Sequence, residues 1–304
     1  MNVAETSALG KRYRSTWALR DCTLAVPAGR IVALVGPNGA GKTTLLHCAV
    51  GLCAATNGNI TVLGNLAAGS LDALDRVAFV AQDAPLHKYL SVRSMLAVAS
   101  NLNSHFDGAQ AEERLCGLEI PLGRKVGKLS GGQQAQLALT LALARHPDLL
   151  VLDEPLARLD PLARHDFMGL VMAAVAASGF SVIFSSHVVS ELERVADYLI
   201  VLAEGRVQMA GEIDDLLAGH AVLSGPAEDS DLVGERFPVV QTRKAARHAE
   251  LLVRATGESE LPSGWESNDV SLEELVLAYL RDPSASTLPG PLALDEPRVT
   301  EVTR

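Results

Sequence analysis

Residues 31–43 read IVALVGPNGAGKT: the apolar run Ile31–Val35 leads into a glycine-rich turn, and a helical pattern begins at Lys42. The turn fits the spacing GxxxxGK[ST] between a strand and a helix, which is the context of a phosphate-binding loop. Glycines allow several backbone N–H groups to point at one spot, and a helix start adds partial positive charge there. The alternative is a glycine-rich turn that happens to contain Lys-Thr.

We expect this loop to bind the phosphate chain of a nucleotide. Lys42 can reach the β- and γ-phosphates, and the Thr43 hydroxyl can ligate Mg²⁺. The predicted phosphate-binding residues are Gly36, Pro37, Asn38, Gly39, Ala40, Gly41, Lys42, Thr43 and Thr44.

A second apolar run, Leu149–Leu152, ends in the two acids Asp153 and Glu154. Two acids at the end of a buried strand are costly unless they have partners. Successive strand residues point to opposite sides, so Asp153 can serve Mg²⁺ while Glu154 faces the attacking water as a general base. The alternative is a strand end in solvent with both acids hydrated.

The remaining pattern predicts an α/β fold. Near-continuous apolar runs are typical of strands buried on both faces of a parallel sheet, and helical patterns lie between them. The predicted strands are Ile31–Val35, Val77–Ala81, Leu149–Leu152, Ser181–Ser185 and Leu199–Leu202. The predicted helices are Lys42–Cys53, Gln133–Arg145, Leu162–Ala177 and Ser190–Ala196, with further helices and no strand in Leu90–Leu118.

Composition excludes several classes of protein. With 304 residues, 48% of them hydrophobic and 20% charged, the chain is neither disordered throughout nor a channel, since no apolar stretch approaches the ~20 residues that cross a bilayer. The net charge of −10 disfavours a nucleic-acid partner. The first residues lack an apolar signal region, and the four cysteines show no disulfide or zinc spacing, so we expect reduced thiols in a cytoplasmic protein.

The motif Leu129-Ser130-Gly131-Gly132-Gln133 precedes a helical run and lies between the phosphate loop and Asp153. Its serine and glycines present a hydroxyl and N–H groups at a helix start, which is a second anion site. With this motif, residues 3–217 resemble the nucleotide-binding subunit of an ABC transporter, for which LSGGQ is the signature. The resemblance implies ATP and Mg²⁺ as ligands, and two copies packed head to tail with each ATP between the loop of one and the signature of the other.

The resemblance also implies roles for single residues. Tyr13 looks like the aromatic that stacks on adenine, with Trp17 as the runner-up, and Gln82 resembles the glutamine that contacts Mg²⁺ or the attacking water. Asp160 resembles the aspartate that links the two active sites, and His187 resembles the histidine that contacts the γ-phosphate. Ser130, Gly131, Gly132 and Gln133 would bind the ATP held by the other copy. Gln134 and Arg158 depart from the usual residues of the family, which affects the dimer contact and not the chemistry.

The domain organisation that follows is a P-loop NTPase (RecA-like) core, a helical signature lobe and a small C-terminal accessory region. We expect an ATPase domain over residues 1–219, with the core at about 1–85 and 146–219 and the lobe at about 86–145. An accessory domain over 220–282 would begin where the acidic, Pro- and Gly-containing stretches start, and Ser271 with Glu274 predicts an N-capped helix there. The composition of the proline-containing tail 283–304 predicts a flexible segment.

The predicted function is ATP hydrolysis that powers a separately encoded membrane permease, from the inner face of the cell membrane. The likeness of Asn101–Lys128 and its flanks to exporter subunits favours export, with import as an alternative. Two further functions stay open: that of a soluble ABC ATPase of the repair, chromosome or translation type, and that of a regulatory subunit without turnover. The short segment between Lys42 and Ser130 has no sustained heptads, which argues against a repair or chromosome type. We expect the permease contact at Gln82–Ser100.

Overall fold

The structure is a computed structural model that describes residues 1–157, 159–189, 192–254 and 261–282. The chain divides into two compact units. The first comprises Met1–Tyr198 with Leu202–Val207, and the second comprises Leu199–Val201 with the chain from Gln208 onward, so the division falls within strands β9 and β10. The predicted tail lies outside the described residues, and the predicted domain bounds stay a prediction.

The central sheet has six strands in the order β10-β9-β3-β8-β7-β6. Strands β3, β8, β7 and β6 are parallel, and every residue of β3, β7 and β8 is buried, as expected where both faces of a sheet are covered. All five predicted strands are confirmed. The bounds are β3 (Ile31–Val35), β6 (Val77–Val80), β7 (Leu149–Leu152), β8 (Ser181–Ser186), β9 (Tyr198–Ala203) and β10 (Arg206–Glu212).

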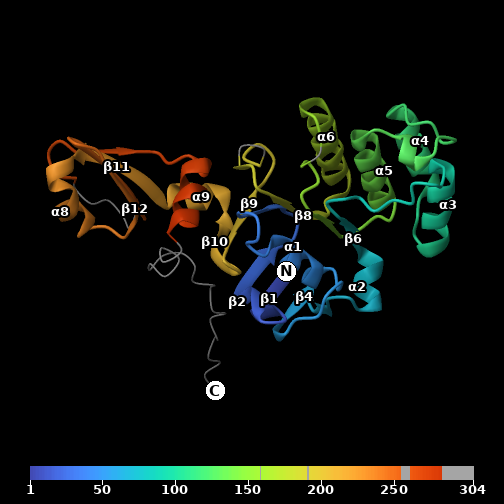
Figure 1. Cartoon of the computed structure of the whole chain (residues 1–304), viewed down its shortest axis with the longest axis horizontal. Coiled ribbons are helices and arrows are strands. Elements are labelled where there is room, and N and C mark those ends of the chain that lie inside the picture. Colours follow the sequence, from blue (N-terminus) through green and yellow to red (C-terminus); the bar gives the residue numbers. More distant parts are fainter. Residues whose placement is uncertain (158, 190–191, 255–260, 283–304) are drawn as a thin grey trace, which may run out of the picture. The chain divides into compact units, whose positions relative to one another are not determined.

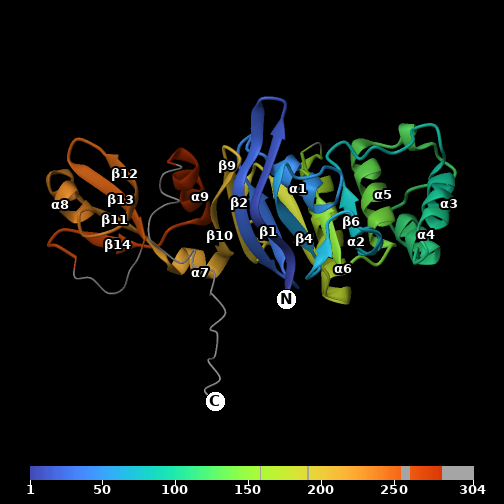
Figure 2. The same ribbon diagram turned by 90° about the horizontal axis from the view of Figure 1, so that it is seen from below.

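A second, antiparallel sheet was not expected from the sequence. Figure 2 shows β1, β2 and β4 of this sheet side by side, and its order is β2-β1-β4-β5. Its strands mix buried and exposed residues, and the β1–β2 register shifts several times, which blurs the alternation of a regular strand. The bounds are β1 (Asn2–Tyr13), β2 (Thr16–Pro27), β4 (Asn57–Val62) and β5 (Leu66–Ala67).

Two helix predictions differ from the structure. Helix α1 (Lys42–Ala49) is shorter than the predicted Lys42–Cys53, because Gly51 takes a left-handed conformation (φ 77°) and its backbone passes so close to Gly69 that a Cβ would collide. In the predicted helix Ser190–Ala196, residues 192–195 form turns, and residues 190 and 191 lie outside the described chain. Helix α6 (Pro161–Ser178) agrees with its prediction, and a short α2 (Leu71–Arg76) precedes β6.

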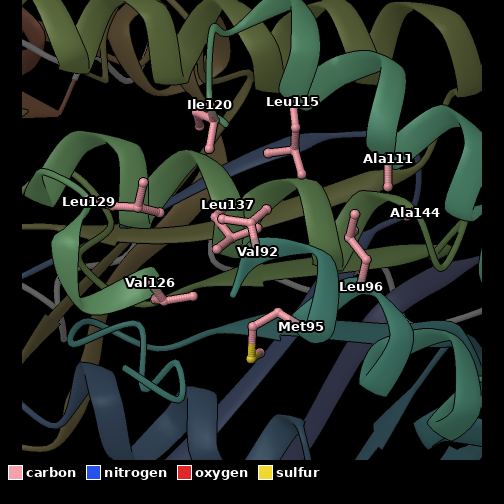
Figure 3. Close-up of a cluster of buried hydrophobic side chains, with 10 residues drawn as sticks. All are labelled: Val92, Met95, Leu96, Ala111, Leu115, Ile120, Val126, Leu129, Leu137 and Ala144. Atoms are coloured by element: carbon pink, nitrogen blue, oxygen red, sulfur yellow. The ribbon is translucent and has the colours of Figure 1, made fainter. Parts of the chain in front are cut away.

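A lobe of helices follows β6 and carries the LSGGQ motif. It contains α3 (Val92–Leu102), α4 (Gly108–Gly117), the short η1 (Val126–Lys128) and α5 (Gly131–Leu143), which gather together in Figure 1. Their apolar side chains meet in one buried cluster, shown in Figure 3, in which Leu115 and Leu137 are fully buried. This packing fixes α5, and with it the position of Ser130 at the helix start.

The second unit contains an antiparallel sheet in the order β12-β13-β11-β14. Its strands are β11 (His220–Pro226), β12 (Val239–Lys244), β13 (His248–Arg254) and β14 (Glu266–Asn268). Its helices are α7 (Ile213–Ala218), η3 (Ala227–Asp229), α8 (Ser230–Gly234) and α9 (Leu272–Arg281). The predicted capped helix is confirmed, since Ser271 and Glu274 form a capping box at the start of α9.

A buried network of hydrogen bonds joins four elements of the second unit, α7, β11, β13 and α9. His220 Nδ1 lies 2.6 Å from the carbonyl oxygen of Leu216, which can only accept, so Nδ1 donates and Nε2 accepts from the Tyr279 hydroxyl at 2.9 Å. Arg254 Nε donates to the same hydroxyl oxygen at 2.7 Å. This arrangement of hydrogen bonds therefore requires a neutral His220.

Within the described residues, no helix combines the length and the apolar character needed to cross a membrane.

We predict that the lobe depends on its buried cluster for stability. Leu115→Ala should lower the free energy of unfolding by about 2–5 kcal/mol, because it opens a cavity at a fully buried position. Leu102→Ala is the matched control, since Leu102 is 78% exposed. Urea titrations give the comparison, and equal midpoints for the two variants would contradict the role of the cluster.

We predict a pH-dependent loss of stability from His220. Burial lowers the pKa of His220, the hydrogen bond to Leu216 opposes this, and nearby Arg254 lowers it further. Its folded-state pKa lies below the unfolded value of about 6.5, so its contribution is complete above about pH 6.5 and is lost as the pH falls through the folded pKa.

The unfolding midpoint of the parent should therefore decrease between about pH 7 and 5 more than that of His220→Gln, which cannot take up the proton. Urea titrations at several pH values measure both. Parallel curves for the two proteins would show that His220 does not couple protonation to folding.

Candidate active site

The phosphate loop lies at the carboxyl end of β3, directly before α1. Gly36 passes so close to the Leu202 carbonyl that a Cβ would collide with it. Gly39 has φ 83°, and a Cβ there would meet nothing within 4 Å, so the backbone at this residue is open to a ligand. The sequence thus places glycine both where the loop packs against the core and where the space beside its backbone is open.

Lys42 is the first residue of α1 and is only 5% exposed. Its Nζ donates to the carbonyl oxygens of Gly36 at 2.7 Å and Pro37 at 3.3 Å. It also lies 3.3 Å from Glu154 Oε1, whose side chain is 12% exposed. The ammonium is therefore held over the loop by two carbonyls and one carboxylate.

Asp153 follows β7 and is almost completely buried. Its Oδ1 accepts hydrogen bonds from the hydroxyls of Thr43 at 3.2 Å and Ser185 at 2.8 Å. The acid at the end of β7 and the threonine of the loop therefore meet, as predicted for a pair that serves Mg²⁺. A hydroxyl and a carboxylate are the hard oxygen donors that this ion prefers, so the residues present fit it.

Glu154 takes a left-handed backbone conformation (φ 42°), which is uncommon for this residue type. Its N–H donates to Ser185 Oγ at 2.8 Å, and its Oε2 lies 3.2 Å from His187 Nδ1. One carboxylate therefore links Lys42 from the loop to His187 from the segment after β8. A hollow of about 40 Å³ lies beside Glu154 and His187, which is room for a water molecule.

Ser185 is the site residue that sequence analysis missed. It is fully buried in β8, donates to Asp153 and accepts from Glu154. A buried hydroxyl needs such partners, because leaving it unpaired costs free energy. The signal available in the sequence was a serine inside the apolar run before His187.

Tyr13 and Trp17 lie on β1 and β2. The Nζ of Lys11 lies 5.1 Å from the centre of the Tyr13 ring, and the Arg12 guanidinium lies 5.4 Å from that of Trp17. Burial and then a hydrogen bond with the Cys53 side chain raise the pKa of Tyr13. Tyr13 is about half exposed, which leaves ring surface open to a planar ligand.

Other predicted site residues lie apart from this group in the contacts of the single chain. Gln82 lies in the turn after β6. The Asp160 side chain caps α6 by accepting from the N–H of Ala163 at 2.9 Å. Ser130 and Gln133 form a capping box at the start of α5, with both hydrogen bonds at 3.2 Å. The structure therefore assigns local structural contacts to Asp160, Ser130 and Gln133.

Comparison with known proteins shows which family the chain resembles. The sequence model described as "ABC transporter" matches residues 19–157, and an AAA-domain model matches residues 123–193. The thiamine import ATP-binding protein ThiQ of Salmonella typhimurium is 34% identical over 207 residues, covering 66% of this chain and 88% of that protein. The molybdenum import ATP-binding protein ModC of Aromatoleum aromaticum is 34% identical over 238 residues, covering 74% of this chain and 61% of that protein.

Solved structures agree on the fold. An ATP-binding subunit of an ABC transporter matches with a TM-score of 0.63 and 28% identity, over 71% of this chain and 92% of that one. A dimeric ATP-binding cassette in a post-hydrolysis state, bound to ADP and Pi, matches with a TM-score of 0.62 and 25% identity, over 69% of this chain and 98% of that one. With its phosphate loop and two strand-end acids, the chain belongs to the ATP-binding subunits of ABC transporters, which are ATPases.

Proposed function

We propose that this chain hydrolyses Mg·ATP between two copies of itself and passes the work to a separate membrane permease. The observation that carries this proposal is the convergence of Lys42, Asp153, Glu154 and His187 at one end of the central sheet. A lysine at a phosphate loop, a carboxylate that can hold Mg²⁺ and a second group that can orient or activate water are parts that phosphoryl transfer to water uses.

The binding step uses groups that already point at the loop. The N–H groups at the start of α1 and the Lys42 ammonium would receive the β- and γ-phosphates, with the glycine backbone at residues 36–41 around them. Tyr13 would stack on the adenine. Thr43 and Asp153 would hold Mg²⁺, with Gln82 reaching the same ion, and the ion would neutralise charge on the phosphate oxygens.

For the chemical step we assign Glu154 as the general base. The hollow beside Glu154 and His187 has room for a water molecule, which would lie against a carboxylate that can take its proton. His187 lies 3.2 Å from Glu154, so it can both orient this carboxylate and donate to the γ-phosphate. Lys42 must leave Glu154 to contact the phosphate, which frees the carboxylate as the substrate arrives.

The second copy would supply the signature. Ser130 is exposed, and its hydroxyl oxygen accepts from the N–H of Gln133 in its own helix, which leaves the hydroxyl hydrogen available to a phosphate of the other copy. Asp160 would contribute at the same junction. The dimeric cassette with ADP and Pi among the similar structures supports a nucleotide-bound dimer.

The permease contact is proposed at a surface in the first unit. An apolar hollow of about 170 Å³ includes Leu52 and Leu74 in its lining, and both are exposed. Phe79 of β6 lines it too, and β6 ends two residues before Gln82. Tyr89, 90% exposed, lies in the predicted contact segment Gln82–Ser100. Exposed apolar groups around a hollow suit an apolar side chain from a partner.

For the direction of transport we propose import. The curated relatives ThiQ and ModC are named import proteins, and they give the export expectation no support. Their names also favour a transporter subunit over a soluble ABC ATPase. A measurement of substrate movement in reconstituted vesicles decides the direction.

We predict that Glu154→Gln abolishes turnover and traps an ATP-bound dimer. Loss of a general base should lower the ATPase rate by about 10²–10⁴-fold, because the water loses its proton acceptor while the binding groups stay. Phosphate release and size-exclusion chromatography with ATP measure the two effects. Glu113→Gln, on the exposed side of α4, is the control. A Glu154→Gln protein that hydrolyses at the parent rate, or stays monomeric with ATP, would remove Glu154 from this role.

We predict that Leu74→Ser and Tyr89→Ser uncouple the ATPase from transport. Each removes apolar surface worth about 1.5–3 kcal/mol if buried against the permease, so affinity for permease-containing membranes should fall roughly tenfold or more. The basal ATPase of the isolated protein should keep the parent value. Leu232→Ser, an exposed leucine of the second unit, is the control. Undiminished transport by both variants would place the permease contact elsewhere.

A further inference from the structure

Two cysteines at the C-terminal end of α1 and just after it have no part in the mechanism above. Cys48 is buried near the end of α1, and Cys53 is half-buried five residues later. Their Sγ atoms lie 3.2 Å apart, with one thiol hydrogen-bonded to the other. The remaining cysteines, Cys22 and Cys116, are buried and exposed respectively.

The backbone holds this contact in place. After α1 ends, the N–H groups of Leu52 and Cys53 both donate to the carbonyl oxygen of His47, at 2.8 and 3.3 Å. These bonds fold the segment back over the end of the helix, so Cys53 returns to Cys48. A disulfide needs an S–S separation of about 2.05 Å, which is an approach of about 1 Å from the present contact.

A metal site explains the pair poorly. In the described residues, no group of three or more His, Cys, Asp or Glu side chains is arranged to hold a metal ion. Structural zinc sites need four such ligands. The pair therefore stands as two thiols that face each other.

We propose that Cys48 and Cys53 form a redox-sensitive pair that hydrogen peroxide oxidises to a disulfide, and that this disulfide weakens ATP binding. In the first step the Cys53 sulfur attacks one peroxide oxygen, the O–O bond breaks, and water leaves, giving a sulfenic acid. In the second step the Cys48 sulfur attacks the Cys53 sulfur, the S–O bond breaks, and a second water leaves with the thiol proton. The two sulfurs lose two electrons and the peroxide gains them.

The order of the two thiols follows from their surroundings. Cys53 is partly exposed, so peroxide can reach it, whereas Cys48 is buried. Burial, and then the neighbouring Cys53, raises the pKa of Cys48 to about 12, which keeps it protonated and disfavours it as the first nucleophile. Contact between the two sulfurs compensates for this in the second step, because reacting atoms held together react at high effective concentration.

The link to ATP runs through Tyr13. Lys11 Nζ donates to the carbonyl oxygen of Ala54, the residue after Cys53, at 2.6 Å and lies 5.1 Å from the centre of the Tyr13 ring, so drawing Cys53 toward Cys48 disturbs a contact beside the ring. Cys48 also lies on α1, the helix whose first residue is Lys42. This part of the inference rests on the proposed stacking of adenine on Tyr13. A base stacked on an aromatic ring contributes enough affinity that its loss should weaken binding about fivefold or more.

The test uses the full chain and one equivalent of hydrogen peroxide. Peptide mass mapping should join the segments that hold Cys48 and Cys53 with the loss of two hydrogens, and thiol titration should fall from four groups to two. ATP affinity, measured with a fluorescent ATP analogue in the absence of turnover, should fall about fivefold or more and return on reduction with a dithiol. Cys116→Ser should behave like the parent.

Two variants keep the proposal falsifiable. Cys53→Ser and Cys48→Ala, each compared with its own reduced form, should lose the peroxide effect on ATP affinity. Absence of the Cys48–Cys53 link after oxidation overturns the proposal, and so does a link that leaves ATP affinity unchanged. A Tyr13→Ala protein separates the two hypotheses. If it binds ATP like the parent, the stacking role fails, while the mass measurement still reports on the disulfide.

Discussion

The ion pair between Lys42 and Glu154 is the interaction on which the rest of the active site depends. Both side chains are largely withdrawn from water, and their charged atoms lie 3.3 Å apart. A buried pair of this kind adds little net stability, because desolvation offsets much of the attraction, yet removing one partner leaves an uncompensated charge. The pair therefore serves mainly to hold each group ready. In the proposed mechanism an incoming phosphate takes the place of Glu154 beside Lys42 and so exchanges one ion pair for another.

The register of the parallel sheet brings these groups together. Leu152 of β7 pairs with Phe184 of β8, so the next residues, Asp153 and Ser185, are neighbours and hydrogen bond at 2.8 Å. Val35 of β3 pairs with Ser186, which places the loop after β3 beside the same strand ends. A shift of one residue in either pairing would turn these side chains to the other face of the sheet. The site is thus a consequence of strand register as much as of residue type.

Whether an element could be predicted from the sequence depends on how it is buried in the sheets. Strands buried on both faces appear in the sequence as continuous apolar runs, and β3, β7 and β8 were predicted within a residue of their observed ends. β1 and β2 show no clean run because one face is exposed and bulges break the period, and the sheet of the second unit is hidden for a similar reason. The site acids and lysine could be predicted from strand ends and glycine spacing. For Ser185 the sequence shows only a serine in the strand before His187, because its role depends on pairing between two strands.

The signature helix α5 explains why one copy of the chain would supply only part of each proposed ATP site. Helices α1 and α5 each present N–H groups at an N-terminus, and such ends attract anions. At α5 the capping box of Ser130 and Gln133 satisfies the N–H of Gln133, while the first N–H groups of a helix, here those of Gly131 and Gly132, have no acceptor within the helix. At α1 hydrogen bonds already hold Lys42 against Gly36 of the loop and Thr43 against Asp153, around the position proposed for a phosphate. A capped, rigid and exposed donor set at α5 suits a ligand brought to it by another molecule, and a second copy carrying ATP on its own α1 satisfies that condition with no new chemistry.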